Sequence, residues 1–202
     1  MSIREELYEL GIKSRAEQNR WIKEHKKEVE AREKIANPRT EKEKLFKLAY
    51  DEETRGQRVG ACASCIVLKE EFKLSTNKIE EMLKECWNLS YTTDEVVKDF
   101  AFEQCYTWIK EIYASVARGS KFEIEKGNLF KVKGEEMFLR TVAYICTALR
   151  DIYSWSFNSK GSGKLNKFVE ATKPWFLDLE NNKIDSDEIL KECRERSGVN
   201  LV

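Results

Sequence analysis

The chain has 202 residues, with 36 basic and 36 acidic side chains, and therefore a formal net charge of zero. Charged residues make up 36% of the sequence, but 5 Trp, 7 Tyr and 10 Phe are enough to fill a core, which argues against disorder. With only 9 Gly and 2 Pro, the chain is neither collagen-like nor of low complexity. The neutral balance also lacks the strong basic excess that is common among nucleic-acid-binding proteins.

The sequence has neither an apolar run long enough to span a membrane nor the apolar stretch of a signal peptide in its first residues, MSIREELYEL. We therefore expect a cytoplasmic protein, in the host cell cytoplasm if a phage encodes it. Cysteines stay reduced there, and we expect all six to pack in the core: Cys62, Cys65, Cys86, Cys105, Cys146 and Cys193. A zinc or redox role for Cys62 and Cys65 stays open, although no second C-x-x-C supplies further zinc ligands.

Helical patterns dominate, and we predict a mainly α fold, an irregular helical bundle. Ser14 and Glu17 form a capping box that opens a charged helix, and the Asn-Pro pair at 37–38 ends it. Thr40 then caps a second helix. We assign residues 1–57 to a charged, helical N-terminal segment.

The second helix continues past Gly56 and Gly60 into a first helical unit, residues 58–118. Apolar side chains from Cys62 to Phe72 recur every three or four residues, and those of the following helix do the same. Thr93 caps a longer helix with apolar residues on nearly all faces. We expect that helix to be central and buried.

One segment, residues 119–134, changes from a helical to an alternating hydrophobic pattern. The sequences KFEIE and LFKVK flank Lys126-Gly127-Asn128, where glycine and asparagine suit the left-handed positions of a tight turn. We predict an inserted β-hairpin over residues 121–133. Because two strands alone are marginally stable, the hairpin is expected to pack on helices or on a partner.

A second helical unit is predicted over residues 135–202, sharing one core with the first. It begins with a strongly amphipathic helix, and a flexible loop follows at 158–163. Three short helices complete it: one starts at Lys164, one is opened by Pro174, and one is capped by Ser186.

Three sequence blocks recur in the same order in the two helical units, which predicts an internal duplication. The blocks pair Cys65–Phe72 with Cys146–Tyr153, Lys78–Leu83 with Lys164–Val169, and Thr93–Asp99 with Ser186–Glu192. Each block alone is a generic amphipathic pattern, so chance similarity between helices stays the alternative. A duplication would place the two units about a pseudo-twofold axis.

The same blocks carry a resemblance to a protein family. The order L-[KR]-[DE]-x-[FY], K-Φ-x-x-Φ-Φ and [ST]-D-E-Φ-Φ, where Φ is apolar, resembles short helical proteins of Gram-positive prophages, a family with no settled activity. The resemblance covers residues 59–99 and 141–199, and the chain departs from the family's Gly-Phe-Gly segment at 73–75 and 154–157. It implies a mobile-element origin and transfers no functional residue.

The sequence holds no convincing catalytic motif. Residues 159–165, SKGSGKL, are similar to a phosphate-binding loop, but Asn158 and Leu165 stand where that loop needs Gly and Ser or Thr. We interpret the segment as a solvated linker, with anion contact by its lysines as a lesser alternative. The single histidine, His25, lies among lysines, where a solvated position is favoured over catalysis. We predict no catalytic residue, no cofactor and no metal ion, and not an enzyme.

The leading functional prediction is a non-catalytic interaction protein of phage or prophage type, which binds a protein partner or self-associates, with modulation of a host enzyme as one form. Aromatic side chains are enriched at such interfaces, and the candidates are Trp155, Phe157, Trp175 and Phe176. The alternative is a helical nucleic-acid-binding regulator with these candidate contacts: Arg15, Arg20, Lys23, Lys26, Lys27, Lys160, Lys164, Lys167 and Lys173. Interleaved Glu residues at ion-pair spacing and the neutral net charge disfavour it.

Overall fold

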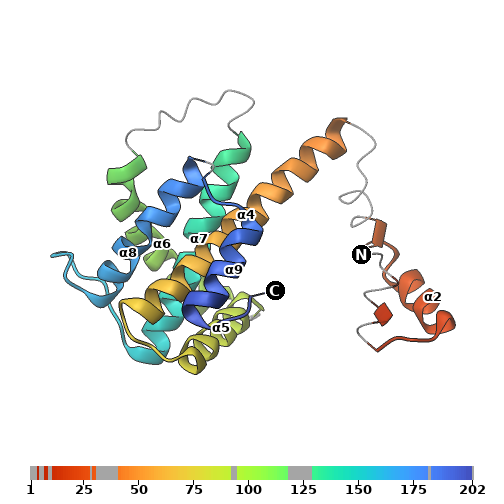
Figure 1. Ribbon diagram of the computed structural model, residues 1–202, viewed down its shortest axis with the longest axis horizontal. Coiled ribbons are helices and arrows are strands. Elements are labelled where there is room, and N and C mark those ends of the chain that lie inside the picture. Colours follow the sequence, from red (N-terminus) through yellow and green to blue (C-terminus); the bar gives the residue numbers. More distant parts are fainter. Residues whose placement is uncertain are drawn as a thin grey trace. The chain divides into compact units, whose positions relative to one another are not determined.

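The structure of the protein is a computed structural model that describes residues 4, 7–8, 11–27, 29–30, 41–91, 95–117, 129–181 and 183–201. Side chains are described at these positions except at 41–43, 45–46, 87–100, 114–117 and 129–133. Over these residues the chain forms seven helices and no strand (Figure 1). The predicted mainly α fold is confirmed as a helical bundle.

The helices, in chain order, are α2 (Arg15–Glu24), α4 (Glu41–Glu70), α5 (Thr76–Tyr91), α6 (Glu95–Ala117), α7 (Leu129–Tyr153), α8 (Lys164–Glu180) and α9 (Ser186–Ser197). The chain divides into two compact units, Met1–Asp51 and Glu52–Val202, and α4 contributes residues to both. Among the described helices, none is both long and apolar enough to cross a lipid bilayer.

In the first unit, the start of α2 follows from its local sequence. The Oγ atom of Ser14 accepts the backbone N–H of Glu17 at 3.2 Å, so the predicted cap is confirmed. The helix α2 ends at Glu24 and a turn follows at residue 25, after which residues 26–27 and 29–30 are helical again. The predicted end at 37–38 and the predicted cap at residue 40 lie outside the described residues. Gln18 is buried, and its side-chain amide donates to the Ile12 carbonyl at 2.9 Å, which satisfies a polar group away from water.

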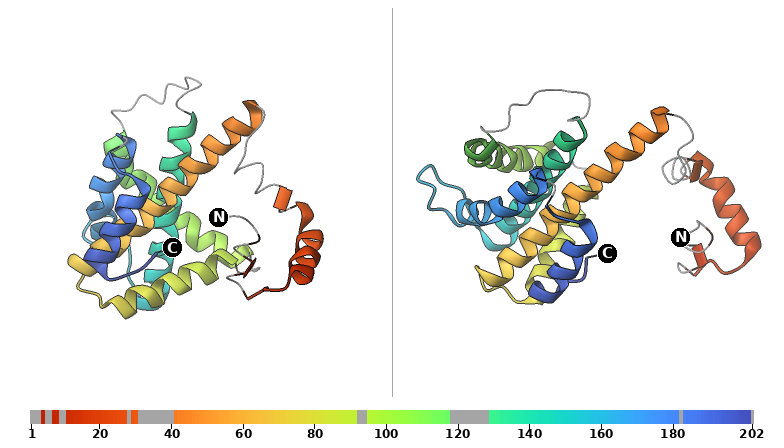
Figure 2. Two further views of the ribbon diagram at one scale, coloured as in Figure 1. Left: turned by 45° about the vertical axis from the view of Figure 1, so that its right-hand side comes forward. Right: turned by 45° about the horizontal axis from the view of Figure 1, so that its top comes forward.

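In the second unit, α7 is the central helix and packs against α5, α6 and α8 (Figure 1 and Figure 2). Three aromatic rings from Tyr113, Phe138 and Phe176 meet edge to face, with centroids 4.8, 5.5 and 6.2 Å apart. Buried residues of α4 and α9 join the same apolar cluster. The prediction that α6 is buried on nearly all faces is wrong over residues 101–113, where its side chains are described, because one side of it is exposed: Glu103, Gln104, Thr107, Lys110 and Glu111.

The helices α4 and α7 cross where glycines let their backbones touch. A Cβ atom at Gly56 would overlap the carbonyl oxygen of Gly134, and one at Gly60 would lie 3.1 Å from the carbonyl oxygen of Phe138. As predicted, α4 continues through both glycines. Tertiary packing at the crossing offsets the poor helix propensity of glycine, about 1 kcal/mol per residue relative to alanine.

The chain reverses in the same way after α4 and after α7. Lys73 and Ser154 both have a left-handed backbone, with φ of 57° and 53°, which is uncommon for residues other than glycine. The next residue in each case donates its N–H to the carbonyl six residues earlier, at 3.0 Å after α4 and 3.5 Å after α7. Residues 65–72 and 146–153 also show the same succession of buried, half-buried and exposed positions. These two sequence blocks therefore have the same local structure.

The predicted β-hairpin is wrong in the part that the structure describes. Residues 129–133, the predicted second strand, form the first turns of α7, whereas residues 121–128 lie outside the described residues. An alternating pattern of only five residues is compatible with a helix, and extending a formed helix is favourable because each added residue gains one hydrogen bond.

Two helix boundaries near the C-terminus also differ from the prediction. Residues 164–180 form one helix, α8, with Pro174 inside it, because buried side chains such as Thr172 and Phe176 hold the helix on both sides of the missing N–H. The N-cap of α9 is Asp185 rather than Ser186. Its carboxylate accepts the N–H groups of the second and third helical residues, at 2.8 and 3.2 Å.

Candidate interaction surface

Two of the four predicted interface aromatics lie in the core. Trp155 is 7% exposed and packs against Phe72 with ring centroids 4.9 Å apart, while Nζ of Lys164 lies 5.4 Å from the centre of its ring. Phe176 is 3% exposed and belongs to the aromatic group described above. Side chains enclosed in this way leave little area for a partner.

The third candidate, Phe157, is half-buried and stacks on a residue that the sequence did not single out. Its ring lies parallel to that of Trp108 on α6, with centroids 5.6 Å apart and planes within 1°. Trp108 is also half-buried. Since each ring covers a face of the other, the pair serves mainly to attach the chain after α7 to α6.

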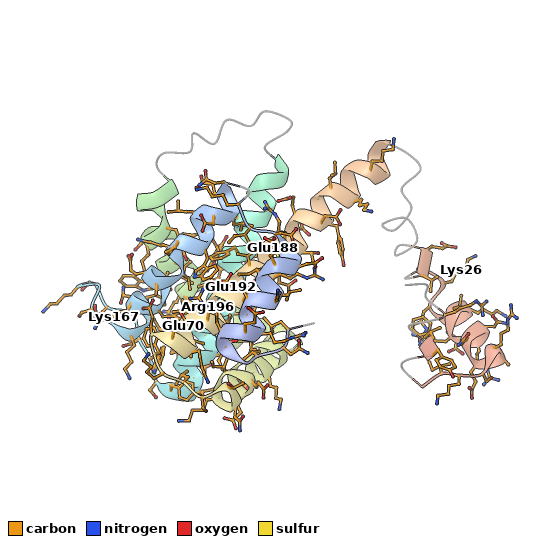
Figure 3. The ribbon with its side chains drawn as sticks, viewed as in Figure 1. Lys26, Glu70, Lys167, Glu188, Glu192 and Arg196 are labelled. Carbon is orange, nitrogen blue, oxygen red and sulfur yellow. The ribbon has the colours of Figure 1, made fainter. Side chains whose placement is uncertain are left out.

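The fourth candidate, Trp175, belongs to a group of side chains that joins three helices. The guanidinium carbon of Arg196 on α9 lies 5.4 Å from the centre of the Trp175 ring on α8. The same guanidinium donates two hydrogen bonds to Glu70 of α4, at 2.8 and 2.5 Å, and one to Glu192 of α9 at 2.5 Å. We call these four side chains the Trp175–Arg196 cluster. Figure 3 shows its three charged members converging.

Local sequence places each charged member of the Trp175–Arg196 cluster. Asp185 caps the start of α9, and Gly198 ends it with a left-handed φ of 75°, which only glycine adopts without strain. Within α9, Glu192 and Arg196 are four residues apart and therefore lie on one face. Glu70 is the last residue of α4, next to the chain reversal.

The charges of the cluster reinforce one another at the surface. The side chains of Arg196, Glu70 and Glu192 are between 37% and 43% exposed. Hydrogen bonds from Arg196 lower the pKa of the Glu70 carboxyl below its ordinary 4.5, and the two carboxylates raise the pKa of the guanidinium. Pairs this exposed add at most about 1 kcal/mol of stability, so their main effect is to fix the guanidinium plane across Trp175.

Two exposed apolar residues of α8 lie close to Trp175 in sequence. Pro174 is exposed, and Leu177 is 36% exposed, the two lying three residues apart on one helix face. Neither residue shares the face of Trp175, because helix neighbours one or two positions apart point in different directions, so the cluster itself combines an aromatic ring with an oriented arginine. Such a surface can bind a partner, whereas none of these groups is a nucleophile or a proton donor matched to neutral pH.

No protein-family model, no curated protein and no solved structure matches this chain. The surface is therefore interpreted from its own chemistry.

The nine basic residues predicted to contact nucleic acid occupy two segments. In the first, all five side chains are exposed, and Lys26 lies 3.7 Å from the carboxylate of Glu30. In the second, Lys173 pairs with Glu170 at 2.6 Å, and Lys164 lies over the Trp155 ring as described above. Intrahelical ion pairs of the predicted kind therefore exist. Nucleic-acid contact stays a prediction.

The segment similar to a phosphate-binding loop hydrogen-bonds to itself. The side chain of Asn158 accepts the N–H of Ser162 at 2.9 Å and donates to its hydroxyl at 3.0 Å. The backbone N–H of Asn158 donates to Asn166 at 2.8 Å, and a Cβ atom at Gly163 would overlap the Ser156 carbonyl oxygen. Backbone N–H groups used in this way do not point together toward a phosphate, so nothing in the loop supports nucleotide binding.

The cysteines and the histidine make packing and hydrogen-bond contacts within the protein. All six thiols are free, five are buried and Cys86 is half-buried, which confirms that they pack in the core. His25 stacks on Trp21 at 4.1 Å, and its Nδ1 lies 2.9 Å from the carbonyl oxygen of that residue. In the described part of the chain, no three residues among the His, Cys, Asp and Glu side chains are placed to hold a metal ion.

The sequence analysis identified Trp175 but missed the three charged residues of its cluster, Glu70, Glu192 and Arg196. The four-residue spacing of Glu192 and Arg196 was a usable signal for an ion pair on one helix. The contact between Arg196 and Glu70 joins residues 126 positions apart, and no local pattern announces it.

Proposed function

We propose that this chain is a non-catalytic interaction protein of phage or prophage type, which binds a protein partner or a second copy of itself through the Trp175–Arg196 cluster. One observation carries the proposal: Arg196 lies across the Trp175 ring with its guanidinium already held by Glu70 and Glu192. Trp and Arg are the residue types most enriched where binding energy concentrates at protein interfaces.

The orientation of Arg196 favours binding in two ways. Immobilising a long side chain on association costs about 0.5–1.5 kcal/mol, and a side chain already held by carboxylates loses less freedom. The three hydrogen bonds also use only three of the five N–H donors of a guanidinium. The two others can donate to oxygen atoms of a partner, while the Trp175 ring offers apolar contact.

The cell compartment and the kind of partner belong to the same proposal. Six free thiols support the cytoplasm, in the host cell if a phage encodes the chain, because thiols persist in a reducing compartment. A host enzyme as the partner rests on the resemblance to prophage proteins alone.

The test compares full-length variants in sedimentation velocity and in capture experiments with the chain as bait. We expect Trp175→Ala and Arg196→Ala each to weaken self-association, or retention of the captured partner, by about tenfold or more. Arg140→Ala is the matched control, because Arg140 pairs with Glu136 at 2.8 Å and lies 6.0 Å from the Tyr106 ring, elsewhere on the second unit. Equal loss in all three variants, or no loss in the first two, contradicts the proposal.

The alternative function, a nucleic-acid-binding regulator, is favoured only by the exposure of its basic residues in the segments 15–27 and 160–167. Phosphate contacts release counterions, so such binding weakens steeply with salt. A salt titration against DNA and RNA tests it. Binding at low salt that Lys160→Glu and Lys167→Glu weaken would support this alternative, and no binding at low salt would remove it.

We also infer that residues 58–118 and 135–202 are related units of one duplicated element, with the predicted pseudo-twofold arrangement. The matching burial of 65–72 and 146–153 supports this inference. So do the left-handed residues Lys73 and Ser154 at the same point of each block. The third pair of blocks adds no support, since the side chains of one member lie outside the described residues.

A further inference from the structure

One stripe of α9 at the protein surface carries opposite charges at its two ends. Glu188, Glu192 and Arg196 are four residues apart and follow one another along the helix (Figure 3). Glu188 and Arg196 are exposed, and Glu192 is half-buried. The stripe that follows each of them by one residue is buried in the core: Ile189, Cys193 and Ser197. The surface stripe is therefore negative near the start of α9 and positive at its end.

The same polarity extends to the rest of the helix. Asp187 and Glu188 are the acidic residues of the first turn of α9, whereas Arg194 and Arg196 are the basic residues of its last turn. This distribution suits the helix dipole, which favours anions at the N-terminus and cations at the C-terminus. It also means that two α9 helices attract each other when they lie antiparallel, because each acidic end then faces a basic end.

Arg196 and Glu188 both have bonding capacity left for a partner. Nε and Nη2 of Arg196 donate to Glu70, and Nη1 donates to Glu192. Nη1 and Nη2 therefore each keep one N–H group, since each of these nitrogens carries two. Among the described residues, no basic side chain pairs with the Glu188 carboxylate. Two N–H groups of one guanidinium match the two oxygens of one carboxylate.

We propose that the charged stripe of α9 binds a second copy of this chain about a twofold axis, with Arg196 of each copy donating to Glu188 of the other. This inference rests on the proposed function and names the partner. Glu188 and Arg196 are about 12 Å apart along the helix, so both pairs form when two antiparallel α9 helices cross at Glu192. Each Glu192 near the axis is already paired with its own Arg196, which offsets the repulsion between the two carboxylates.

Charge favours a second copy over an unrelated acidic protein. The Trp175–Arg196 cluster holds two carboxylates and one guanidinium, so a partner that brings an acidic group alone meets net repulsion. A second copy brings both signs, and each ion pair forms twice in such an interface. The chain also has 36 basic and 36 acidic residues, so no net charge opposes the approach of two copies.

Sedimentation velocity of the full chain at increasing concentration measures the association. We expect the wild type to dimerise at low salt, and added salt to weaken the dimer because it screens exposed ion pairs. Glu188→Arg and Arg196→Glu each bring like charges together across the axis, so each should raise the dimer dissociation constant about tenfold or more. An equimolar mixture of the two variants should dimerise as well as the wild type. In the mixed dimer the two substituted side chains face each other, and so do the two unchanged ones.

Controls separate this contact from a general effect of charge. Glu136→Arg and Arg140→Glu reverse the charges of an ion pair on α7, and both should dimerise as the wild type does. Glu188→Arg leaves the bonds of Arg196 within its own chain in place, and circular dichroism confirms that each variant folds.

Three results would overturn the inference: a wild type that is monomeric at all concentrations, Glu188→Arg and Arg196→Glu variants that dimerise as it does, or a mixture of these two that associates no better than each alone. The proposed binding of another protein is judged separately, by whether Trp175→Ala loses a captured partner.

Discussion

Replacing Gly56 by alanine tests the close approach of α4 and α7. The new Cβ atom would overlap the carbonyl oxygen of Gly134, which belongs to a helical backbone and cannot rotate away as a side chain can. The two helices must therefore separate, and overpacking of this kind costs up to about 3 kcal/mol. Alanine returns about 1 kcal/mol through its better helix propensity.

The difference predicts a loss of about 2 kcal/mol in the free energy of unfolding, or a fall in Tm of about 4–8 °C for a chain of this size. Differential scanning calorimetry of the full chain measures it. The control is Gly60→Ala on the same helix, where the new Cβ lies 3.1 Å from the Phe138 carbonyl oxygen and 3.2 Å from Thr141 Cβ. There, small shifts relieve the contact, and we expect a Tm change near zero.

Two results would refute this reasoning. If Gly56→Ala raises Tm, the backbones do not touch at this residue and only helix propensity acts. If Gly56→Ala and Gly60→Ala lower Tm equally, the loss comes from glycine replacement in α4 in general and not from the overlap with Gly134.

Three further changes test other parts of the second unit. Tyr113→Phe removes a buried hydroxyl that lies 2.5 Å from Thr172 Oγ1, and urea unfolding should show a loss of about 1 kcal/mol. Gly198→Ala should lower Tm, because its φ of 75° disfavours a side chain and the new Cβ would lie 3.0 Å from Thr76 Oγ1; an unchanged Tm would contradict the left-handed cap. The ion pair of Glu70 lowers its pKa below 4.5, so its contribution is present at neutral pH and is lost as the pH falls through the folded-state pKa. Wild type should therefore exceed Glu70→Gln by at most about 1 kcal/mol at neutral pH and not at all in acid, and a constant difference across that range would argue against the pair.

Sequence predicted the features that depend on neighbours along the chain. Ser14 and Glu17 are three residues apart, and their hydrogen bond needs nothing outside α2. The helical spacing from Cys62 to Phe72 predicted one buried face, whereas α4 is buried on all sides over residues 62–68, which only the helices packed around it decide. The same local rules failed where distant packing decides the outcome: Pro174 predicts a helix start, yet contacts on both sides keep α8 continuous.

The candidate interface aromatics also show that local sequence does not reveal what distant packing decides. Trp155, Phe176 and Trp175 are all aromatic residues near helix ends or within short helices, and no local pattern separates the two buried rings from the half-exposed one. Burial is set by which helix lies across each ring. One of the two carboxylates that orient Arg196, that of Glu70, belongs to α4, so this contact depends on how α9 packs rather than on the sequence around Arg196.

The left-handed residues after α4 and α7 have a consequence for finding distant relatives. Lys and Ser are chemically unlike, and neither side chain favours a positive φ, yet the backbone angle differs by only a few degrees between them. What the two segments share is therefore carried by dihedral angles and burial rather than by residue type. A search that aligns proteins by successive φ values and exposure would recognise this turn where an alignment of amino acids finds scattered identities.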